Sequence, residues 1–254
     1  MKIVFIGAGN LATNLSVALQ KTGNEIAQVY SRTEESATML ASRLGCEWTI
    51  SMKELKNDAD LYIVSLADYA VPSLVDEMKE GREDRLFVHT AGTLPMDILK
   101  TERRGVFYPM QTFSKTRIVE LTDFPMFIEA SNEEDAAMLE QLARSLSQNV
   151  FHLNSADRQY LHLAAVFCSN FVNHCYALCD EILKEHNVPF SVMLPLIDEV
   201  ASKIHTLSPK DAQTGPAIRH DENVMAKHMS LLQNNPRLQS IYDIMSKSIA
   251  YDKL

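Results

Sequence analysis

The sequence predicts an α/β protein in which a doubly wound, mostly parallel sheet is followed by an all-helical C-terminal domain. Three observations support this prediction. Short apolar runs alternate with helical patterns up to residue 153, and the first of these runs leads directly into a glycine turn. A long stretch without proline or glycine begins soon after residue 153. Strands that alternate with helices form parallel sheets covered on both faces. We therefore expect one domain at residues 1–153 and a second at residues 154–254.

The first strand, residues 2–6, runs into the spacing Gly7-x-Gly9-x-x-Ala12, and residues 10–20 follow as an amphipathic helix. Gly7 permits a sharp turn, Gly9 leaves room for a pyrophosphate, and Ala12 lets the helix lie close to the strand. The start of that helix offers N–H groups and a partial positive charge to phosphates. A glycine turn of some other α/β protein is the alternative. We expect a Rossmann-type dinucleotide site made of Gly7, Ala8, Gly9, Asn10, Leu11 and Ala12.

The rest of the first domain follows the same alternation. Helical spacing of apolar residues predicts helices at residues 36–44, 71–78 and 133–146, with Gly45 ending the first of them. Apolar and β-branched runs predict strands at residues 25–31, 60–66, 85–89, 105–108, 125–130 and 149–153.

The end of the second strand bears on the choice of nucleotide. NAD-binding sheets usually place an acid there to hold the ribose hydroxyls. This chain has Ser31, Arg32 and Thr33 instead. A guanidinium pairs with a 2′-phosphate through two hydrogen bonds, and hydroxyls add further ones. The pattern favours NADP(H) over NAD(H), although Arg32 could merely flank a helix that Thr33 caps.

Ligands of an open parallel sheet bind outside the carboxyl ends of its strands. This rule indicates a coenzyme site that also includes Ser65, Leu66, Ala67, Thr90, Ala91 and Gly92. Nearby, Asp68 is suited to capping a helix, and His89 suits either proton exchange or a structural role. The polar and aromatic segment at residues 108–113 is expected to border the same cleft.

The second domain is predicted to start with a helix from residue 158 to about residue 186, followed by helices at residues 191–205, 221–232 and 236–250. In a continuous α-helix, His162, Ser169, Asn170 and Asn173 share one face. Buried polar groups need partners, which a substrate or an interhelical network could supply. Arg219 precedes a helix that Asp221 can cap, a position suited to a carboxylate or phosphate.

Composition restricts the function further. A net charge of −9 argues against general nucleic-acid binding, and the apolar runs are too short to cross a membrane. The chain opens directly with a strand, so we expect no cleaved leader. The four cysteines lack a Cys-x-x-Cys pair and suit reduced thiols in a cytoplasmic protein. No set of residues has the spacing of a metal site.

Several motifs together resemble a known family. Gly7-Ala-Gly-Asn-Leu-Ala12 with Ser31-Arg32-Thr33 is similar to the NADP-binding domains of pyrroline-5-carboxylate reductases and deazaflavin-dependent NADP reductases. Nearly the whole chain resembles a bacterial family that joins such a domain to a helical C-terminal domain of unknown function. Its motifs here are His89-Thr-Ala-Gly-Thr93, Tyr108-Pro-Met-Gln-Thr-Phe113, His162-Leu-Ala-Ala-Val-Phe-Cys-Ser-Asn170 and Thr214-Gly-Pro-Ala-Ile-Arg-His-Asp221.

This resemblance implies an NADP-dependent oxidoreductase whose helical domain contributes to a homodimer, as in enzymes similar to 6-phosphogluconate dehydrogenase. The lysine that related β-hydroxyacid dehydrogenases use is missing, and His162 and Asn170 are only loosely comparable with their catalytic pair.

Our hypothesis is hydride transfer between NADPH and a small C=O or C=N compound bound between the two domains. In it His162 is the general acid, Asn170 orients the substrate and Arg219 holds an anionic group. The leading alternative is a nucleotide sensor without catalytic activity, and chemistry like that of ketopantoate reductase differs only in its substrate.

Overall fold

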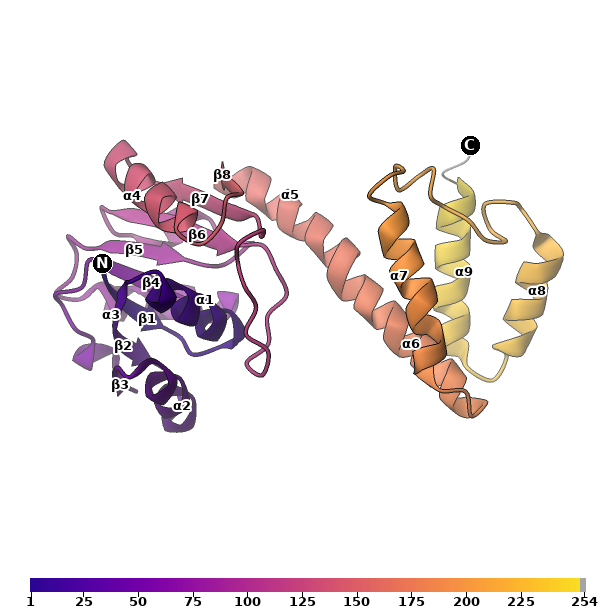
Figure 1. Cartoon of the computed structure of the whole chain (residues 1–254), viewed down its shortest axis with the longest axis horizontal. Helices are drawn as coiled ribbons and strands as arrows, with labels where there is room; N and C mark the ends of the chain where they lie inside the picture. The colour runs from indigo at the N-terminus through magenta and orange to yellow at the C-terminus, as the bar shows by residue number, and fades with distance from the viewer. Residues whose placement is uncertain (252–254) are drawn as a thin grey trace. The chain divides into compact units, whose positions relative to one another are not determined.

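The computed structural model describes residues 1–251 and divides into two compact units, Met1–Ser169 and a second that begins at Asn170 (Figure 1). The sequence-based boundary at residue 153 follows the last strand, whereas the units divide farther along, inside the long helical segment. Helix α5 (Ser155–Ala165) therefore belongs to the first unit by its contacts.

The first unit contains an eight-stranded sheet with the order β3-β2-β1-β4-β5-β6-β7-β8. All neighbouring strands are parallel except β6 and β7, which confirms the predicted mostly parallel, Rossmann-type sheet. The sequence did not predict β3, which has only three residues. The strands are β1 (Lys2–Ile6), β2 (Glu25–Tyr30), β3 (Glu47–Thr49), β4 (Leu61–Val64), β5 (Leu86–His89), β6 (Arg104–Pro109), β7 (Met126–Ala130) and β8 (Val150–His152).

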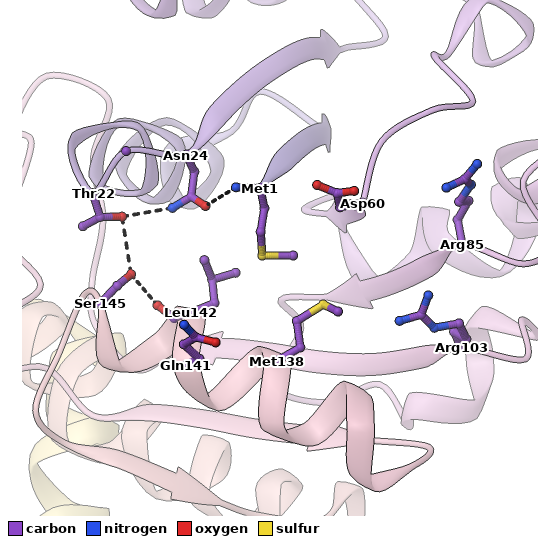
Figure 2. A pocket seen from close by; sticks show the side chains of 11 residues that line it. Met1, Thr22, Asn24, Asp60, Arg85, Arg103, Met138, Gln141, Leu142 and Ser145 are labelled. Carbon is purple, nitrogen blue, oxygen red and sulfur yellow. Dashed lines mark hydrogen bonds between the residues drawn. The ribbon is translucent and has the colours of Figure 1, made fainter.

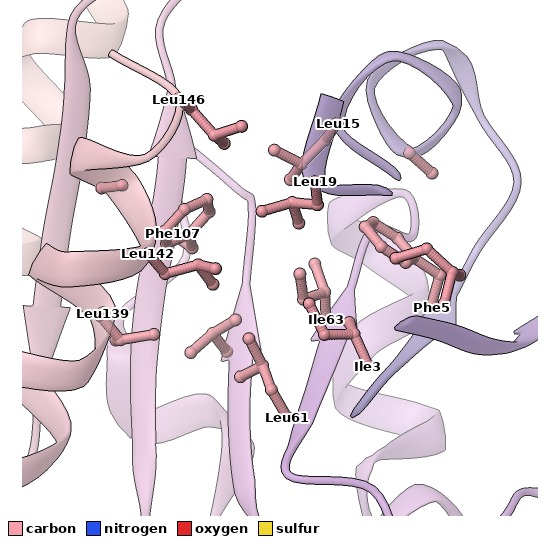
Figure 3. Packing of buried hydrophobic residues seen from close by; sticks show 14 of the residues in the cluster. Ile3, Phe5, Leu15, Leu19, Leu61, Ile63, Phe107, Leu139, Leu142 and Leu146 are labelled. Atoms are coloured by element: carbon pink, nitrogen blue, oxygen red, sulfur yellow. The ribbon is translucent and has the colours of Figure 1, made fainter. Parts of the chain in front are cut away.

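Helices cover both faces of this sheet because its strands are apolar on both sides. In β1, Ile3 and Phe5 pack in one buried cluster, and Val4 and Ile6 pack in the other. Helices α1 (Asn10–Lys21), α2 (Glu34–Leu44) and α4 (Glu133–Arg144) contribute to the first cluster (Figure 3), and α3 (Val71–Lys79) contributes to the second. Each fully buried aliphatic or aromatic side chain stabilises the fold by roughly 1.5–3 kcal/mol.

The register of the central strands determines which loops become neighbours. Ile6, the last residue of β1, pairs with Val64 of β4, and Val64 pairs with His89 of β5. The segments that follow these three residues therefore leave the sheet at the same edge. They carry most of the residues predicted to bind the coenzyme.

The second unit is helical in its described part. Its elements are α6 (Val172–Glu185), η5 (Phe190–Met193), α7 (Leu194–Lys203), α8 (Glu222–Leu231) and α9 (Pro236–Tyr251). As predicted, Asp221 caps α8, since its side chain accepts a hydrogen bond from the N–H of Val224. Within residues 1–251, no helix combines the length and apolar character needed to cross a membrane.

The long helix predicted from residue 158 is not a continuous α-helix. Between α5 and α6 lies η4 (Val166–Phe171), which is π-helical. A π turn holds more residues than an α turn, so it rotates the side chains that follow it relative to those before it. The prediction that His162 and Asn170 share one helical face assumed α-helical geometry throughout, and that assumption was wrong.

Candidate active site

The glycine turn after β1 is built as its spacing predicts. Gly7 has a φ of +124°, a conformation that side chains disfavour, and a Cβ placed there would overlap the carbonyl oxygen of Ser65. Its N–H donates to the carbonyl oxygen of Tyr30 at 2.8 Å. The turn thus passes between the ends of β2 and β4 with no space for a side chain at Gly7.

Helix α1 presents its N-terminus at this turn. Gly9 is the N-cap residue, no side chain caps the helix, and no acidic residue lies in its first turn. A Cβ built on Gly9 would meet no atom within 4 Å, so the approach to the helix is open. Ala12 is fully buried, Leu11 half-buried and Asn10 exposed. Uncapped N–H groups at an accessible helix start suit a phosphate.

The three residues proposed for the 2′-phosphate lie directly after β2. Ser31 is buried, and its N–H donates to the carbonyl oxygen of Thr49. Arg32 is exposed, and none of the described residues forms an ion pair with it. Thr33 occupies the N-cap position of α2, yet its side chain makes no capping hydrogen bond. The structure therefore leaves the Arg32 guanidinium and the Thr33 hydroxyl available to a ligand.

Two more basic residues lie close to the glycine turn. A small hollow there is lined by Ala8, Ser36, Arg43 and Lys115, among others. The guanidinium of Arg43 donates to the carbonyl oxygen of Lys115 at 3.4 Å. The sequence did not predict these two residues for the site. Lys115 lies in a loop far along the chain, and only tertiary contacts bring it to the glycine turn beside Arg43.

The ends of β4 and β5 carry a small cluster of hydroxyl groups. The Thr90 hydroxyl donates to Ser65 Oγ at 3.3 Å, and the Thr93 hydroxyl donates to the Asp68 carboxylate. Leu66 is half-buried and Ala67 is exposed. Asp68 does not cap α3, because the N-cap residue of that helix is Ala70 and no side chain caps it. These short side chains keep the edge of the sheet accessible beside the glycine turn.

His89 lies at the same edge but is fully buried. Its Nδ1 accepts a hydrogen bond from the N–H of Ala91 at 3.2 Å. Burial, together with the nearby charge of Arg158, lowers the pKa of His89 to about 4. A neutral imidazole that holds the loop after β5 explains His89 better than proton exchange does.

His162, the residue predicted to be the general acid, lies against this edge. Its Nδ1 is 3.1 Å from the hydroxyl oxygen of Tyr108, which ends up buried in β6. A Cβ added to Gly92 would overlap the imidazole ring, so only glycine lets His162 lie this close to the loop after β5. The structure thus joins three residues that are far apart in the sequence.

A buried ion pair fixes the start of α5, the helix that carries His162. The fully buried Arg158 donates to Glu129 Oε2 at 2.6 Å and also to the carbonyl oxygen of Leu94. Ser155 adds hydrogen bonds from its N–H and its hydroxyl to the same carboxylate, at 3.0 and 2.7 Å. Arg158 lies one helical turn before His162, so this cluster determines where the imidazole can be.

The other two predicted substrate residues belong to the second unit. Asn170 lies in the π-helical segment η4, and Arg219 is exposed in the loop before α8. His220 beside it has a φ of +54°. His162 lies in the first unit, whereas Asn170 and Arg219 belong to the second. Their roles remain predictions.

A cavity in the first unit lies at the opposite edge of the sheet. It has a volume of about 580 Å³, and Figure 2 shows the side chains that line it. Asp60, Arg85 and Arg103 each directly precede a strand, so they mark the amino ends of β4, β5 and β6. Arg103 is also paired with the buried Asp135. Neither the glycine turn at Gly7 nor the N-terminus of α1 lines this cavity, so it is not the proposed coenzyme site.

Comparisons with known proteins agree with this geometry. Residues 2–92 match the family described as NADP oxidoreductase, coenzyme F420-dependent, and residues 124–249 match a domain of unknown function, DUF2520. A crystal structure from Bacteroides fragilis, named "putative NADP oxidoreductase", is 54% identical, with 98% of each chain covered and a TM-score of 0.95. No functionally curated protein matches the sequence.

More distant structures share the fold alone. An imine reductase from Myxococcus stipitatus in complex with NADP⁺ is 15% identical, with a TM-score of 0.70 over 98% of this chain and 93% of the other. A pyrroline carboxylate reductase from Plasmodium falciparum with NADP bound is 12% identical, with a TM-score of 0.63 and 98% of each chain covered. The resemblance to pyrroline-5-carboxylate reductases is confirmed. The chain belongs to the NADP oxidoreductase-like family that joins a Rossmann-type domain to the domain of unknown function DUF2520.

Proposed function

We propose that this protein is an NADP(H)-dependent oxidoreductase that transfers a hydride to or from a small C=O or C=N compound. One observation carries the proposal: a residue able to exchange protons, His162, packs on Gly92 at the sheet edge that also bears the open N-terminus of α1. Reduction of C=O or C=N needs a hydride at carbon and a proton at oxygen or nitrogen. A coenzyme site with an adjacent acid supplies both.

The residues present fit NADP(H). The N-terminus of α1 and the open side of Gly9 would hold the pyrophosphate, and Ser31, Arg32 and Thr33 would hold the 2′-phosphate. Thr90, Ala91 and Gly92 would border the nicotinamide, which carries the hydride. Two acids in the first turn of α2, Glu34 and Glu35, oppose a 2′-phosphate, so the preference for NADP(H) rests on the cationic Arg32.

The side chains of the protein would supply the proton and bind the substrate. His162 would give a proton to the substrate oxygen or nitrogen during reduction and take it back during oxidation. Asn170 would orient the polar group of the substrate, and Arg219 would pair with an anionic group on it. We further propose that the protein acts in the cytoplasm as a homodimer joined through its helical domain.

The first test is a fluorescence titration with NADPH and NADH, followed by a metabolite screen for NADPH oxidation. We expect tighter binding of NADPH and turnover of at least one carbonyl or imine compound, with the His162→Ala variant losing turnover far more than NADPH affinity. Binding without oxidation of any compound would favour a nucleotide sensor. Indifference to both coenzymes would refute the proposal.

A further inference from the structure

We propose that Tyr108 is a positioning residue that holds the imidazole of His162 with Nδ1 toward β6 and Nε2 toward the substrate. The inference rests on the proposed function for its catalytic meaning, although the hydrogen bond itself can be tested without a substrate.

Tyr108 is well placed to act as a fixed support. It belongs to β6, an interior strand of the sheet, and only 8% of the residue is exposed. Its ring packs against Phe127 of β7 with the centroids 6.4 Å apart. The ring of His162 meets the Tyr108 ring edge-on, with the centroids 6.3 Å apart and 64° between the planes. Because the strand holds the phenol, the phenol can hold the histidine.

The loop after β5 packs against the same edge of the imidazole as Tyr108. The atoms of His162 nearest to Gly92 are Nδ1, Cγ and Cβ, so this edge of the ring faces the sheet. Nε2 lies on the opposite edge. No residue in the described part of the chain forms a hydrogen bond with Nε2, and this nitrogen is not buried. The imidazole therefore has one nitrogen fixed by the protein and one accessible from solvent.

A phenol suits both protonation states of the histidine. Burial raises the pKa of Tyr108, against the opposing charge of Arg158 and with the help of Asp68, so the phenol keeps its proton at neutral pH. It can donate to Nδ1 of a neutral imidazole and accept from Nδ1–H of an imidazolium. During reduction the Nε2 proton would move to the substrate oxygen or nitrogen as hydride reaches carbon. The imidazolium becomes neutral with its remaining proton on Nδ1, from which the phenol oxygen accepts, and a solvent proton taken up at Nε2 restores the imidazolium.

The test measures the ¹⁵N resonances of the His162 ring in the full-length protein, about two pH units above the ordinary imidazole pKa of about 6.5. The His162→Gln variant identifies the signals among the eight histidines. We expect a proton on Nε2 and an Nδ1 shift typical of a hydrogen-bond acceptor. In the Tyr108→Phe variant, Nδ1 should move to the position of a free imidazole. An Nδ1 signal at the position of a free imidazole in the unmodified protein would overturn the inference.

Tyr160→Phe is the matched control. Tyr160 lies on α5, the helix that carries His162, it is 75% exposed, and its substitution removes the same hydroxyl group. Its spectrum should match that of the unmodified protein. A Tyr108→Phe spectrum that also matches would refute the inference. If Tyr108→Phe does not fold, Gly92→Ala is the second variant. It displaces the ring, so its Nδ1 signal should lose the hydrogen-bonded shift, and retention of that shift would count against the inference.

Kinetics separate this inference from the proposed function. With any substrate from the metabolite screen, Tyr108→Phe should lower kcat about tenfold or more while KM and NADPH affinity change less than about twofold. An unchanged kcat would deny Tyr108 a role in positioning. Failure of the protein to bind NADPH would refute the proposed function but leave the nitrogen shifts as they are.

Discussion

Gly7 and Gly9 show how the same residue type serves two different physical needs two positions apart. Gly7 has a positive φ, and its Cα lies against the Ser65 backbone, so the fold itself requires glycine at this position. Gly9 has an ordinary φ of −78° and open space where a Cβ would be. Any need for glycine there must come from a ligand. The spacing in the sequence cannot distinguish these two cases, whereas the structure does.

Gly7→Ala should destabilise the protein, and Gly9→Ala should not. Strain at a positive φ costs about 1–3 kcal/mol before the overlap with the Ser65 carbonyl is counted. We expect urea denaturation to show a loss of at least this size for Gly7→Ala and less than about 1 kcal/mol for Gly9→Ala. Gly9→Ala should instead weaken NADPH binding about tenfold or more. Normal affinity in that variant would place the pyrophosphate elsewhere.

Arg32 should discriminate between the two coenzymes. A charge-assisted hydrogen bond contributes about 1.5–3 kcal/mol, so Arg32→Gln should raise the Kd for NADPH about 10- to 100-fold. NADH has no 2′-phosphate, and its Kd should change less than threefold or so. Arg144→Gln is the control, since Arg144 is an exposed arginine on α4 that pairs with Glu140. Equal losses for both coenzymes would show that Arg32 does not read the 2′-phosphate.

At the scale of elements, helix α5 depends on the buried pair of Arg158 and Glu129. A buried ion pair is weak evidence of net stabilisation, because both charges lose their hydration. Removing one partner is nevertheless costly, because the other charge remains buried without compensation. The cluster therefore acts mainly to specify where α5 begins, and with it the position of His162.

Arg158→Met should lower the free energy of unfolding by about 3–5 kcal/mol. Arg144→Met, on an exposed helix face, should change it by less than about 0.5 kcal/mol. Urea denaturation measures both. The ¹⁵N signals of the His162 ring should also change in Arg158→Met, since α5 loses its anchor. A stable variant with unchanged His162 signals would show that the pair does not position this helix.

The central elements were predictable because their patterns are local. Residues 2–6 form an apolar run that ends in glycine, and the observed β1 and α1 follow it almost residue for residue. The three-residue β3 has too short a pattern to stand out. The sequence of η4, VFCSNF, contains no glycine or proline and continues the helical pattern of its neighbours, so its π-helical turn could not be predicted.

The candidate site was predictable only where it depends on backbone geometry. The glycine turn and the strand ends follow from topology, since parallel strands of known order bring their carboxyl ends together. The pairing of Tyr108 with His162 depends on tertiary packing. Arg158, which fixes the helix that carries His162, lies between Asp157 and Gln159, so its local sequence is typical of an exposed helix position and does not indicate its burial.

At the scale of the whole molecule, His89 makes stability depend on pH. Its pKa is about 4 in the folded protein, below the ordinary value of 6.5. As the pH falls below 6.5 the unfolded chain therefore binds a proton first, and this favours unfolding. The stability contribution is complete above about pH 6.5 and is lost as the pH approaches 4.

Replacing His89 should reduce this dependence. The difference of about 2.5 pKa units corresponds to roughly 3.4 kcal/mol at most. His89→Asn keeps an acceptor for the N–H of Ala91 but cannot titrate. We expect the free energy of unfolding, measured between pH 7 and pH 4, to fall less in His89→Asn than in the unmodified protein by roughly this amount. If the free energy of unfolding depends on pH equally in the two proteins, the pKa of His89 is the same in the folded and the unfolded chain.

The second unit has an apolar surface that its own helices do not cover. Helix α7 has no buried residue, and 60% of Leu196, 60% of Val200 and 54% of Ile204 are exposed. These residues are four positions apart and therefore form one stripe along the helix. Monomeric proteins rarely expose a contiguous apolar surface of this kind, and burying it would contribute about 25 cal/mol per Å².

We expect a second copy of the chain to cover this stripe, consistent with the homodimer proposed for the helical domain. Sedimentation equilibrium should then give twice the chain mass of 28.6 kDa. Val200→Asp places a charge in the middle of the stripe and should shift the protein toward monomers, because an unpaired charge is costly to bury. Glu199→Gln is the control, since Glu199 neighbours the stripe in sequence and lies about 100° away from Val200 around the helix. A carboxylate within a dimer contact would weaken it. If Val200→Asp sediments as a dimer with an unchanged dimer dissociation constant, the stripe is therefore not part of the dimer contact.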